Sequence, residues 1–276
     1  MSAPAVPAQA ASRSSFYAGM RVLPKPEREA MYAIYGFCRI VDDIADDQQG
    51  DPALRGAQLD QWRADIAALY TGGDGGQAAF LAPAIRRFGL ARPDFEAVID
   101  GMAMDAERDI CWPSHAELDL YCDRVASAVG RLSVRVFGMD EAPGLALAHH
   151  LGRALQLTNI LRDIDEDAGI GRVYLPREAI EAAGIRVGDI PTVVNDPRID
   201  QVAQGLAAEA RVHFDQSAKI LKGRQRGHLI APRLMAGAYA ELLRRMVRAG
   251  WAPPRQRVRH NRIALLWMLL RLRLGG

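Results

Sequence analysis

Residues 156–167 read QLTNILRDIDED and place oxygen-bearing side chains among apolar ones. Gln156, Asn159, Asp163 and Asp167 follow one another at steps of three, four and four residues. These spacings put residues on one face of an α-helix, so a helix gathers the four side chains into a single stripe. Because leucines surround the start of the stripe, we expect its polar groups to face a cavity and not open water.

A second acidic segment, residues 35–47, lies far away in the chain and reads YGFCRIVDDIADD. Tyr35, Arg39, Asp42 and Asp46 are spaced by four, three and four residues and therefore also share a helix face. Two aspartates at this spacing repel each other by roughly 0.2–0.5 kcal/mol unless a cation lies between them. The segment is therefore predicted to bind a positively charged partner.

Together the two stripes have the composition of a magnesium site. Hard cations such as Mg²⁺ take oxygen ligands and are usually held by one or two carboxylates plus substrate phosphates, whereas zinc prefers Cys and His. Either stripe alone is equally typical of a solvated helix face whose aspartates pair with Arg39 or Arg162. Two such stripes in one chain favour a site where Mg²⁺ meets a diphosphate.

The rest of the sequence predicts an all-α protein. Helical periodicity dominates, alternating β-branched runs are nearly absent, and 49% of the 276 residues are hydrophobic, enough for a sizeable core. We expect residues 1–12 to be a flexible tail and residues 13–276 to form one bundle-like domain. Expected helices cover residues 27–47, 53–70, 78–88, 93–107, 115–137, 142–167, 176–183, 198–222, 227–249 and 256–272.

Charge and cysteine content restrict the location and the partners. Thirty-five basic and 33 acidic residues are too balanced to indicate nucleic acid, and three cysteines without a CxxC pair indicate reduced thiols in a cytoplasmic protein. No apolar run reaches the roughly 20 residues that span a bilayer. The basic and apolar segment around residues 262–271 is either a last core helix or a peripheral contact with the inner membrane face.

These motifs resemble those of the squalene and phytoene synthase family of head-to-head prenyl transferases. The similarity covers most of the chain and runs through three ordered motifs. They are Arg39-x-x-Asp42-Asp43-x-x-Asp46, Gln156-x-x-Asn159-Ile160-x-Arg162-Asp163-x-x-x-Asp167 and Arg172-Val173-Tyr174-Leu175-Pro176. Stretches at residues 99–102, 121–133 and 149–159 are most similar to the bacterial hopanoid branch of the family.

The resemblance implies a fold and a reaction. The fold is a class I isoprenoid synthase-like helical bundle around a central apolar cavity. The reaction joins two farnesyl diphosphates to presqualene diphosphate with release of diphosphate, using Mg²⁺, or Mn²⁺ in its place, and without NADPH. The implied metal ligands are Asp42, Asp46, Asn159, Asp163 and Asp167.

The resemblance also assigns roles to other residues. Tyr121, Arg39, Arg162, Asp42 and Asp163 are the implied catalytic residues, with Tyr121 steadying a carbocation or assisting proton movement. The implied substrate contacts are Ser15, Phe16, Tyr35, Arg39, Gln156, Asn159, Arg162, Arg172, Tyr174 and Tyr239. Residues 13–16 depart from the family's usual polar triplet before the phenylalanine, so Arg13, Ser14 and Ser15 remain alternatives for the diphosphate contact.

Two smaller expectations concern side chains near the stripes. Large apolar residues are candidates for the cavity wall, although each is also typical of plain core: Phe16, Phe37, Leu155, Leu157, Ile160 and Met235. Adjacent residues of a helix point in different directions, so we do not expect His149 and His150 to share a metal ion.

Other functions fit parts of the same sequence. A related enzyme could continue to squalene or dehydrosqualene, or could act on geranylgeranyl diphosphate to make phytoene. A protein of the same fold could instead serve as a membrane-associated scaffold, or as a carrier that only binds prenyl lipid. Two self-repelling acidic stripes favour an enzyme over a scaffold, and a carrier would differ from an enzyme by slow release of the lipid without chemistry.

Overall fold

The computed structural model describes residues 20–46, 52–107, 110–223 and 226–259, and these are mostly helical, as predicted. Within them the only β-type pairing is an isolated bridge between Cys111 and Val173. The α-helices are α3 Lys25–Ala45, α4 Pro52–Thr71, α5 Ala82–Phe88, α6 Arg92–Glu107, α7 His115–Cys122, α8 Ala128–Val136, α9 Glu141–Arg162, α10 Ile164–Gly169, α11 Arg177–Ala182, α12 Ile190–Val194, α13 Ile199–Lys222 and α14 Ile230–Ala249. A 3₁₀-helix, Gly76–Leu81, and a π-helical turn, Asp123–Ser127, complete the set.

Helix α3 forms where the first acidic segment predicts it. Pro26 lies in its first turn, where a missing N–H costs no hydrogen bond. Ile34, Phe37 and Val41 recur at helical spacing and are fully buried, so they fix which face of α3 packs inward. Asp42 lies beside this buried face and is itself half-buried.

The single helix predicted over residues 142–167 is confirmed as far as Arg162 but is interrupted at Asp163. Helix α9 ends at Arg162, and Asp163 has φ −107° and ψ 16°, outside the helical range. A short helix, α10, follows, with the Asp167 N–H bonded to the Asp163 carbonyl at 2.8 Å. The second acidic stripe is therefore bent at its third member.

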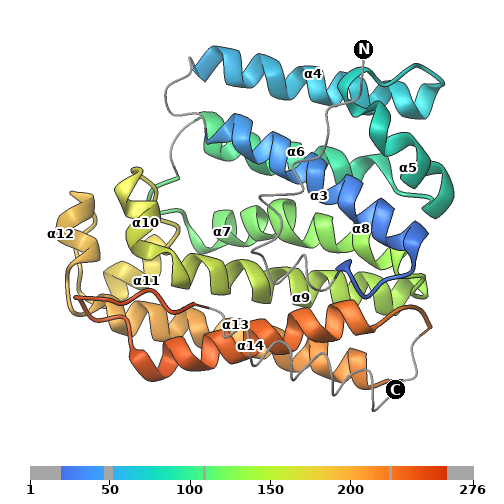
Figure 1. Ribbon diagram of the computed structural model, residues 1–276. Helices are drawn as coiled ribbons and strands as arrows, with labels where there is room; N and C mark the ends of the chain where they lie inside the picture. Colours follow the sequence, from blue (N-terminus) through green and yellow to red (C-terminus); the bar gives the residue numbers. More distant parts are fainter. Residues whose placement is uncertain (1–19, 47–51, 108–109, 224–225, 260–276) are drawn as a thin grey trace.

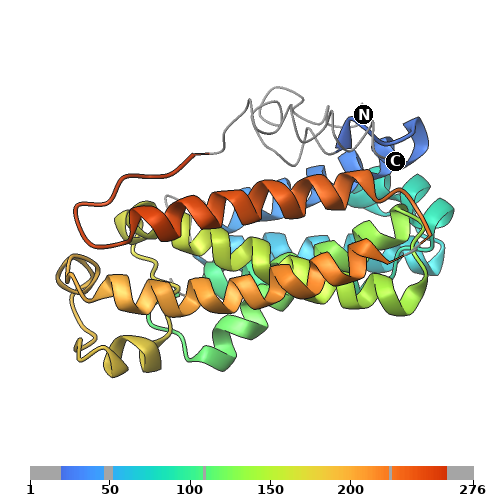
Figure 2. The same ribbon diagram turned by 90° about the horizontal axis from the view of Figure 1, so that it is seen from below.

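Figure 1 shows α9 in the middle of the molecule, between a group containing α3, α4 and α6 and the pair α13 and α14. Figure 2 shows α9, α13 and α14 as three long helices that lie side by side. Buried side chains form two clusters, one built mainly by α3, α4, α6 and α8 and the other mainly by α9, α13 and α14. The fold is thus two packed layers of helices that meet beside α9.

An apolar cavity of about 90 Å³ lies where the two clusters meet, lined among others by Met31, Leu155 and Met235. Of the predicted wall residues in the described part, Leu155 and Met235 are confirmed. Phe37, Leu157 and Ile160 are core residues instead. Phe37, for example, packs its ring 5.3 Å from that of Phe95.

Close backbone approach shapes one wall of this cavity. A Cβ atom added to Gly152 of α9 would lie 2.7 Å from the Ser127 Cα atom. Only glycine fits there, so α9 and the π-helical turn pack against each other at backbone distance. Gly152 itself lines the cavity.

The chain after α14 differs from the prediction as far as it is described, because residues 251–259 are irregular and not helical. Trp251 anchors them: its indole N–H donates to the Leu161 carbonyl at 2.8 Å, and its backbone N–H donates to Asp200 at 2.6 Å. The predicted membrane-contacting segment and the tail of residues 1–12 lie outside the described residues. None of the described helices has the length and apolar character that crossing a bilayer requires.

Candidate active site

The first stripe keeps its predicted geometry. On α3, the Arg39 guanidinium lies 2.5 Å from Asp42 and 2.6 Å from Asp43. Burial raises the pKa of Asp42 to about 6, and the charge of Asp46 adds to this shift. Tyr35 lies close enough that Arg39 and Asp42 both influence its pKa, which burial raises. All four predicted residues therefore share one charged face.

The second stripe is more buried and is held by arginines. Asp163 has 17% of its side chain exposed and bonds to Arg162, whose Nε lies 2.9 Å away, and to Arg257, whose Nη2 lies 2.5 Å away. Burial raises the pKa of Asp167 to about 7, and the neighbouring Asp163 charge is the next cause. Arg257 is a site residue that the sequence did not reveal.

Asn159 offers an oxygen with nothing bound to it. Its Oδ1 atom is buried and has no hydrogen-bond partner among the described residues, while its Nδ2 lies 3.5 Å from Gln156 Oε1. Leaving a buried carbonyl oxygen unbonded costs about 1–3 kcal/mol. Such an orphaned oxygen beside carboxylates fits a hard cation as its missing partner.

Arg172 joins the two stripes. Its backbone N–H donates to the Asp167 carbonyl at 2.9 Å, and its guanidinium reaches Asp46 at 2.6 Å and the Ala45 carbonyl at 3.2 Å. Burial opposes the charge of Arg172, but the hydrogen bond to Asp46 and the charge of Asp105 outweigh it and raise the pKa. This arginine is thus a buried, permanently charged link between α3 and the turn after α10.

Asp105, at the end of α6, is a site residue that the sequence analysis missed. It is buried and accepts hydrogen bonds from the Tyr121 and Tyr174 hydroxyls, each at 2.9 Å. The two tyrosine rings stack with centroids 4.9 Å apart. Burial raises the pKa of Asp105 to about 6, partly offset by the charge of Arg172. Its negative charge also raises the pKa of Asp42 and that of Asp167, so Asp105 interacts with both stripes.

The sequence carries a signal for Asp105, because this residue lies just beyond the stretch Ile99-Asp100-Gly101-Met102, which resembles the family. A Cβ on Gly101 would lie 2.6 Å from a Val125 methyl carbon, so α6 packs tightly against the π-helical turn at this point. Asp105 follows Gly101 by four residues and therefore lies one helical turn further along the same face.

The remaining predicted contacts divide into three groups. Burial lowers the pKa of Arg162, but Asp163 and then Tyr239 of α14 outweigh this effect and raise it, so these two predicted substrate contacts lie close together. Tyr121 and Tyr174 line a separate, more polar cavity of about 320 Å³ and not the apolar one. Arg13, Ser14, Ser15 and Phe16 lie outside the described residues.

The apolar cavity leads toward these polar groups. On each of three helices, the residue four positions after a cavity-lining side chain is a predicted site residue, one turn further along the same face. The pairs are Met31 and Tyr35, Leu155 and Asn159, and Met235 and Tyr239. One end of the cavity is therefore bordered by hydrogen-bonding groups.

The carboxylates do not converge on a single point. Within the described ranges, the one group of three or more His, Cys, Asp or Glu donors close enough to share an ion is a histidine cluster elsewhere. Oxygen donors that are spread out in this way match Mg²⁺ held by one or two carboxylates and completed by substrate phosphate oxygens. The residues present therefore fit Mg²⁺ together with a diphosphate.

Comparison with known proteins agrees with this arrangement. Residues 9–264 match the family model described as squalene/phytoene synthase. The chain is 63% identical to a presqualene diphosphate synthase of Zymomonas mobilis, covering 95% of this chain and 90% of the relative. It is 52% identical to a presqualene diphosphate synthase of Rhodopseudomonas palustris, covering 93% and 92%.

A solved structure shares the fold. The crystal structure of a dehydrosqualene synthase in complex with ligand superposes with a TM-score of 0.78 at 24% identity, covering 95% of this chain and 91% of that one. The family model matches nearly the whole chain, and two relatives share more than half of their aligned residues with it, which establishes the family. The chain belongs to the squalene/phytoene synthase family and is a prenyl transferase.

Proposed function

We infer that this enzyme joins two farnesyl diphosphates head to head, giving presqualene diphosphate and one free diphosphate. The observation that carries this inference is an apolar cavity lined by α3 and α9, the two helices that lead further along the chain into the acidic stripes and their arginines. The apolar lining suits a prenyl chain, and the charged residues further along the same helices suit its diphosphate. The names of the two relatives above half identity support the same product.

The carboxylates and one amide form the proposed magnesium site, with Mn²⁺ as a possible substitute. Asp42 and Asp46 contribute from α3, and Asn159, Asp163 and Asp167 contribute from α9 and the turn after it. When bound, Mg²⁺ supplies positive charge that stabilises the leaving diphosphate. The orphaned Asn159 oxygen and the raised pKa values of Asp42 and Asp167 both support a cation as the missing partner.

The arginines are proposed to bind the diphosphate directly. A guanidinium donates two parallel hydrogen bonds to phosphate oxygens, which suits Arg39, Arg162 and Arg172. Arg172 is 4% exposed at its side chain and is fixed by Asp46, so it can hold a diphosphate oxygen without a large loss of side-chain entropy. Tyr35, Gln156 and Tyr239 complete the polar border, and Ser15 and Phe16 remain proposed contacts from outside the described residues.

The buried pair Tyr121 and Tyr174 is proposed to act through Asp105. Ionisation leaves an allylic cation, which the double bond of the second substrate captures, and closing the cyclopropane ring then releases one proton. Both hydroxyls donate to Asp105, so each hydroxyl oxygen can accept a proton while passing its own to the carboxylate. A carboxyl with a pKa of about 6 is a competent acceptor near neutral pH.

A reaction that stops at presqualene diphosphate needs no hydride, so we expect no NADPH requirement. The test is product analysis with farnesyl or geranylgeranyl diphosphate, each with Mg²⁺ and with or without NADPH. The inference predicts a cyclopropyl C30 diphosphate and one diphosphate from the farnesyl substrate, unchanged by NADPH. Squalene as the product, or phytoene-type coupling of the longer substrate alone, would contradict it.

A further inference from the structure

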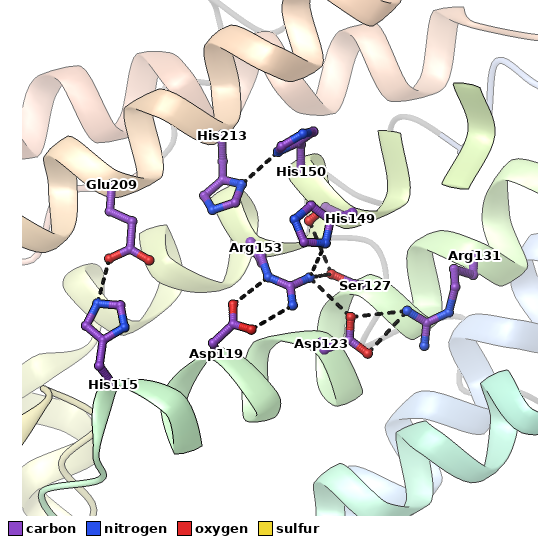
Figure 3. A network of polar contacts seen from close by, with 10 residues as sticks. All are labelled: His115, Asp119, Asp123, Ser127, Arg131, His149, His150, Arg153, Glu209 and His213. Carbon is purple, nitrogen blue, oxygen red and sulfur yellow. Dashed lines mark hydrogen bonds and ion pairs between the residues drawn. The ribbon is translucent and has the colours of Figure 1, made fainter. Parts of the chain in front are cut away.

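Three histidines meet on one side of the helix pair α9 and α13, apart from the acidic stripes. His149 and His150 come from α9 and His213 comes from α13 (Figure 3). One ring nitrogen from each lies within 4.8 Å of the other two. The sequence gives no reason to expect that His149 and His150 share a metal ion, yet their ring centroids are only 4.8 Å apart. The third histidine, from α13, could not be anticipated from a pair in α9.

We propose that His149, His150 and His213 bind a divalent transition-metal ion of the Zn²⁺ type, at a site separate from the magnesium site. The Nδ1 atoms of His150 and His213 are 3.0 Å apart. Nitrogens that bind a tetrahedral Zn²⁺ at about 2.0–2.1 Å lie roughly 3.3 Å from each other, so this pair needs only a small adjustment. His149 is exposed, and one of its ring nitrogens lies within 4.8 Å of both other ligand atoms.

The protonation states favour metal binding. Burial is the main cause that lowers the pKa of all three histidines, and that of His213 falls to about 4, with the neighbouring imidazoles adding to the effect. Neutral imidazole is the form that binds metals. Of His150 and His213, one now donates its Nδ1 proton to the other; with an ion bound, that ring carries its proton on Nε2.

A neighbouring arginine sets the order of the three ligands. Arg153 donates to His149 Nδ1 at 2.9 Å, so that bond must break before His149 uses this nitrogen. Asp119 binds the same guanidinium through two hydrogen bonds, of 2.6 and 3.0 Å, and Asp123 binds it at 3.1 Å. These carboxylates offset the arginine charge near the ion. His150 and His213 are therefore the primary ligands and His149 is the weaker third.

An ion in this position would connect α13 to the helix that lines the apolar cavity. Leu151, Gly152 and Leu155 of α9 all border that cavity, and His149 and His150 directly precede them. Fixing α9 to α13 with metal bonds stabilises the folded state by an amount that grows with the logarithm of the metal concentration relative to its Kd. The ion is thus expected to raise the melting temperature.

The test uses the full chain with saturating Mg²⁺ to occupy the oxygen-donor site. Zn²⁺ is titrated by calorimetry, and Co²⁺ is titrated by visible absorption, which reports nitrogen ligation. We expect one ion per chain and a higher Tm. His213→Ala and His150→Gln should each weaken binding by at least about tenfold, and His149→Ala should weaken it less.

His115→Ala is the matched control, because His115 also contacts α13, at Glu209, but lies outside the cluster (Figure 3). It should keep full binding. Circular dichroism and diphosphate release with Mg²⁺ check that each variant is folded. Absence of Zn²⁺ and Co²⁺ binding in the wild type would overturn the proposal, and so would binding that survives in both His213→Ala and His150→Gln.

Discussion

The two acidic stripes look alike in sequence but differ in structure. The first lies on one regular helix, and its Asp42 pairs with Arg39 of the same helix. The second bends at Asp163, which is bound by Arg162 and by Arg257 from the chain after α14. At Asp42 the first stripe is therefore held by its own helix, with a distant contact only from Arg172 to Asp46, whereas the second stripe is held at Asp163 by a distant segment.

This difference has a consequence for metal binding. An ion that approaches Asp163 competes with the Arg162 and Arg257 guanidinium groups, and an ion that approaches Asp42 competes with Arg39. Burial is also the main cause of the raised pKa in both stripes, with the higher value, about 7, at Asp167. We therefore expect that an ion binds the second stripe only after it displaces an arginine from a distant segment and a more tightly held proton.

Removing one carboxylate from either stripe should have the largest effect. Asp163→Asn and Asp42→Asn each remove a proposed metal ligand while keeping the side-chain volume. Turnover should fall by about 10²- to 10³-fold in both, because stabilisation of the leaving group is lost. Diphosphate release from farnesyl diphosphate measures this, with circular dichroism to check folding.

Asp165→Asn is the matched control, because Asp165 lies in the same segment but pairs with Arg255, 3.0 Å away, outside the proposed ligand set. Its turnover should stay close to that of the wild type. If Asp42→Asn and Asp163→Asn both retain wild-type turnover, the stripes are ordinary charged helix faces. Retained prenyl binding without any turnover in the wild type would favour the scaffold or carrier function.

Asp105 tests whether the two stripes act together, since its charge reaches both. Asp105→Asn keeps a partner for the Tyr121 and Tyr174 hydroxyls but removes the charge and the proton acceptor. We expect kcat to fall by roughly 10- to 100-fold with KM nearly unchanged. Steady-state kinetics with farnesyl diphosphate measure both parameters.

Asp100→Asn is the control for this variant, because Asp100 lies on the same helix and pairs with Arg63 on the protein surface. A change in KM alone, or equal losses in the two variants, would assign Asp105 a structural role only.

The pH dependence of magnesium binding should separate the stripes. A metal ion binds the ionised carboxylate, so protonation of Asp42 below about pH 6 and of Asp167 below about pH 7 weakens binding. The Kd should therefore decrease as the pH rises from about 5 to about 8. Calorimetric titration with Mg²⁺ across this range measures it, and Asp167→Asn should lack the upper inflection.

The same groups make the metal-free protein less stable at high pH. Their folded pKa values lie above the ordinary value of about 3.9, so the folded state binds more protons than the unfolded state. Their stabilising contribution is complete below about pH 4 and is lost as the pH rises through 6 and 7. Thermal melts without metal should show this decline, and saturating Mg²⁺ should reverse it. A flat Tm across this range would contradict the burial of these carboxylates.

How much of the site the sequence predicts depends on where each residue lies. The α3 stripe follows from helical spacing alone, because all its members belong to one regular element. Periodicity does not reveal the break at Asp163, since Asp163 and Asp167 keep helical spacing across it. Asp105 and Arg257 reach the site from α6 and from the segment after α14. Such convergence is set by tertiary packing, which a single sequence does not show.

Replacing Arg257 tests the difference between the two stripes most specifically, and its expected effect is the smallest. It binds Asp163 and also lies 3.1 Å from Glu166, so Arg257→Ala removes a cation that competes with the metal at the second stripe only. An exposed ion pair is worth about 0.2–1 kcal/mol, so magnesium affinity should rise by roughly 1.4- to fivefold. Arg255→Ala removes a neighbouring arginine that binds Asp165 and should leave the affinity unchanged. Weaker magnesium binding in Arg257→Ala would show that Arg257 supports the site and does not compete with the metal ion. The two stripes would then differ in backbone shape, but not through a competing arginine from a distant segment.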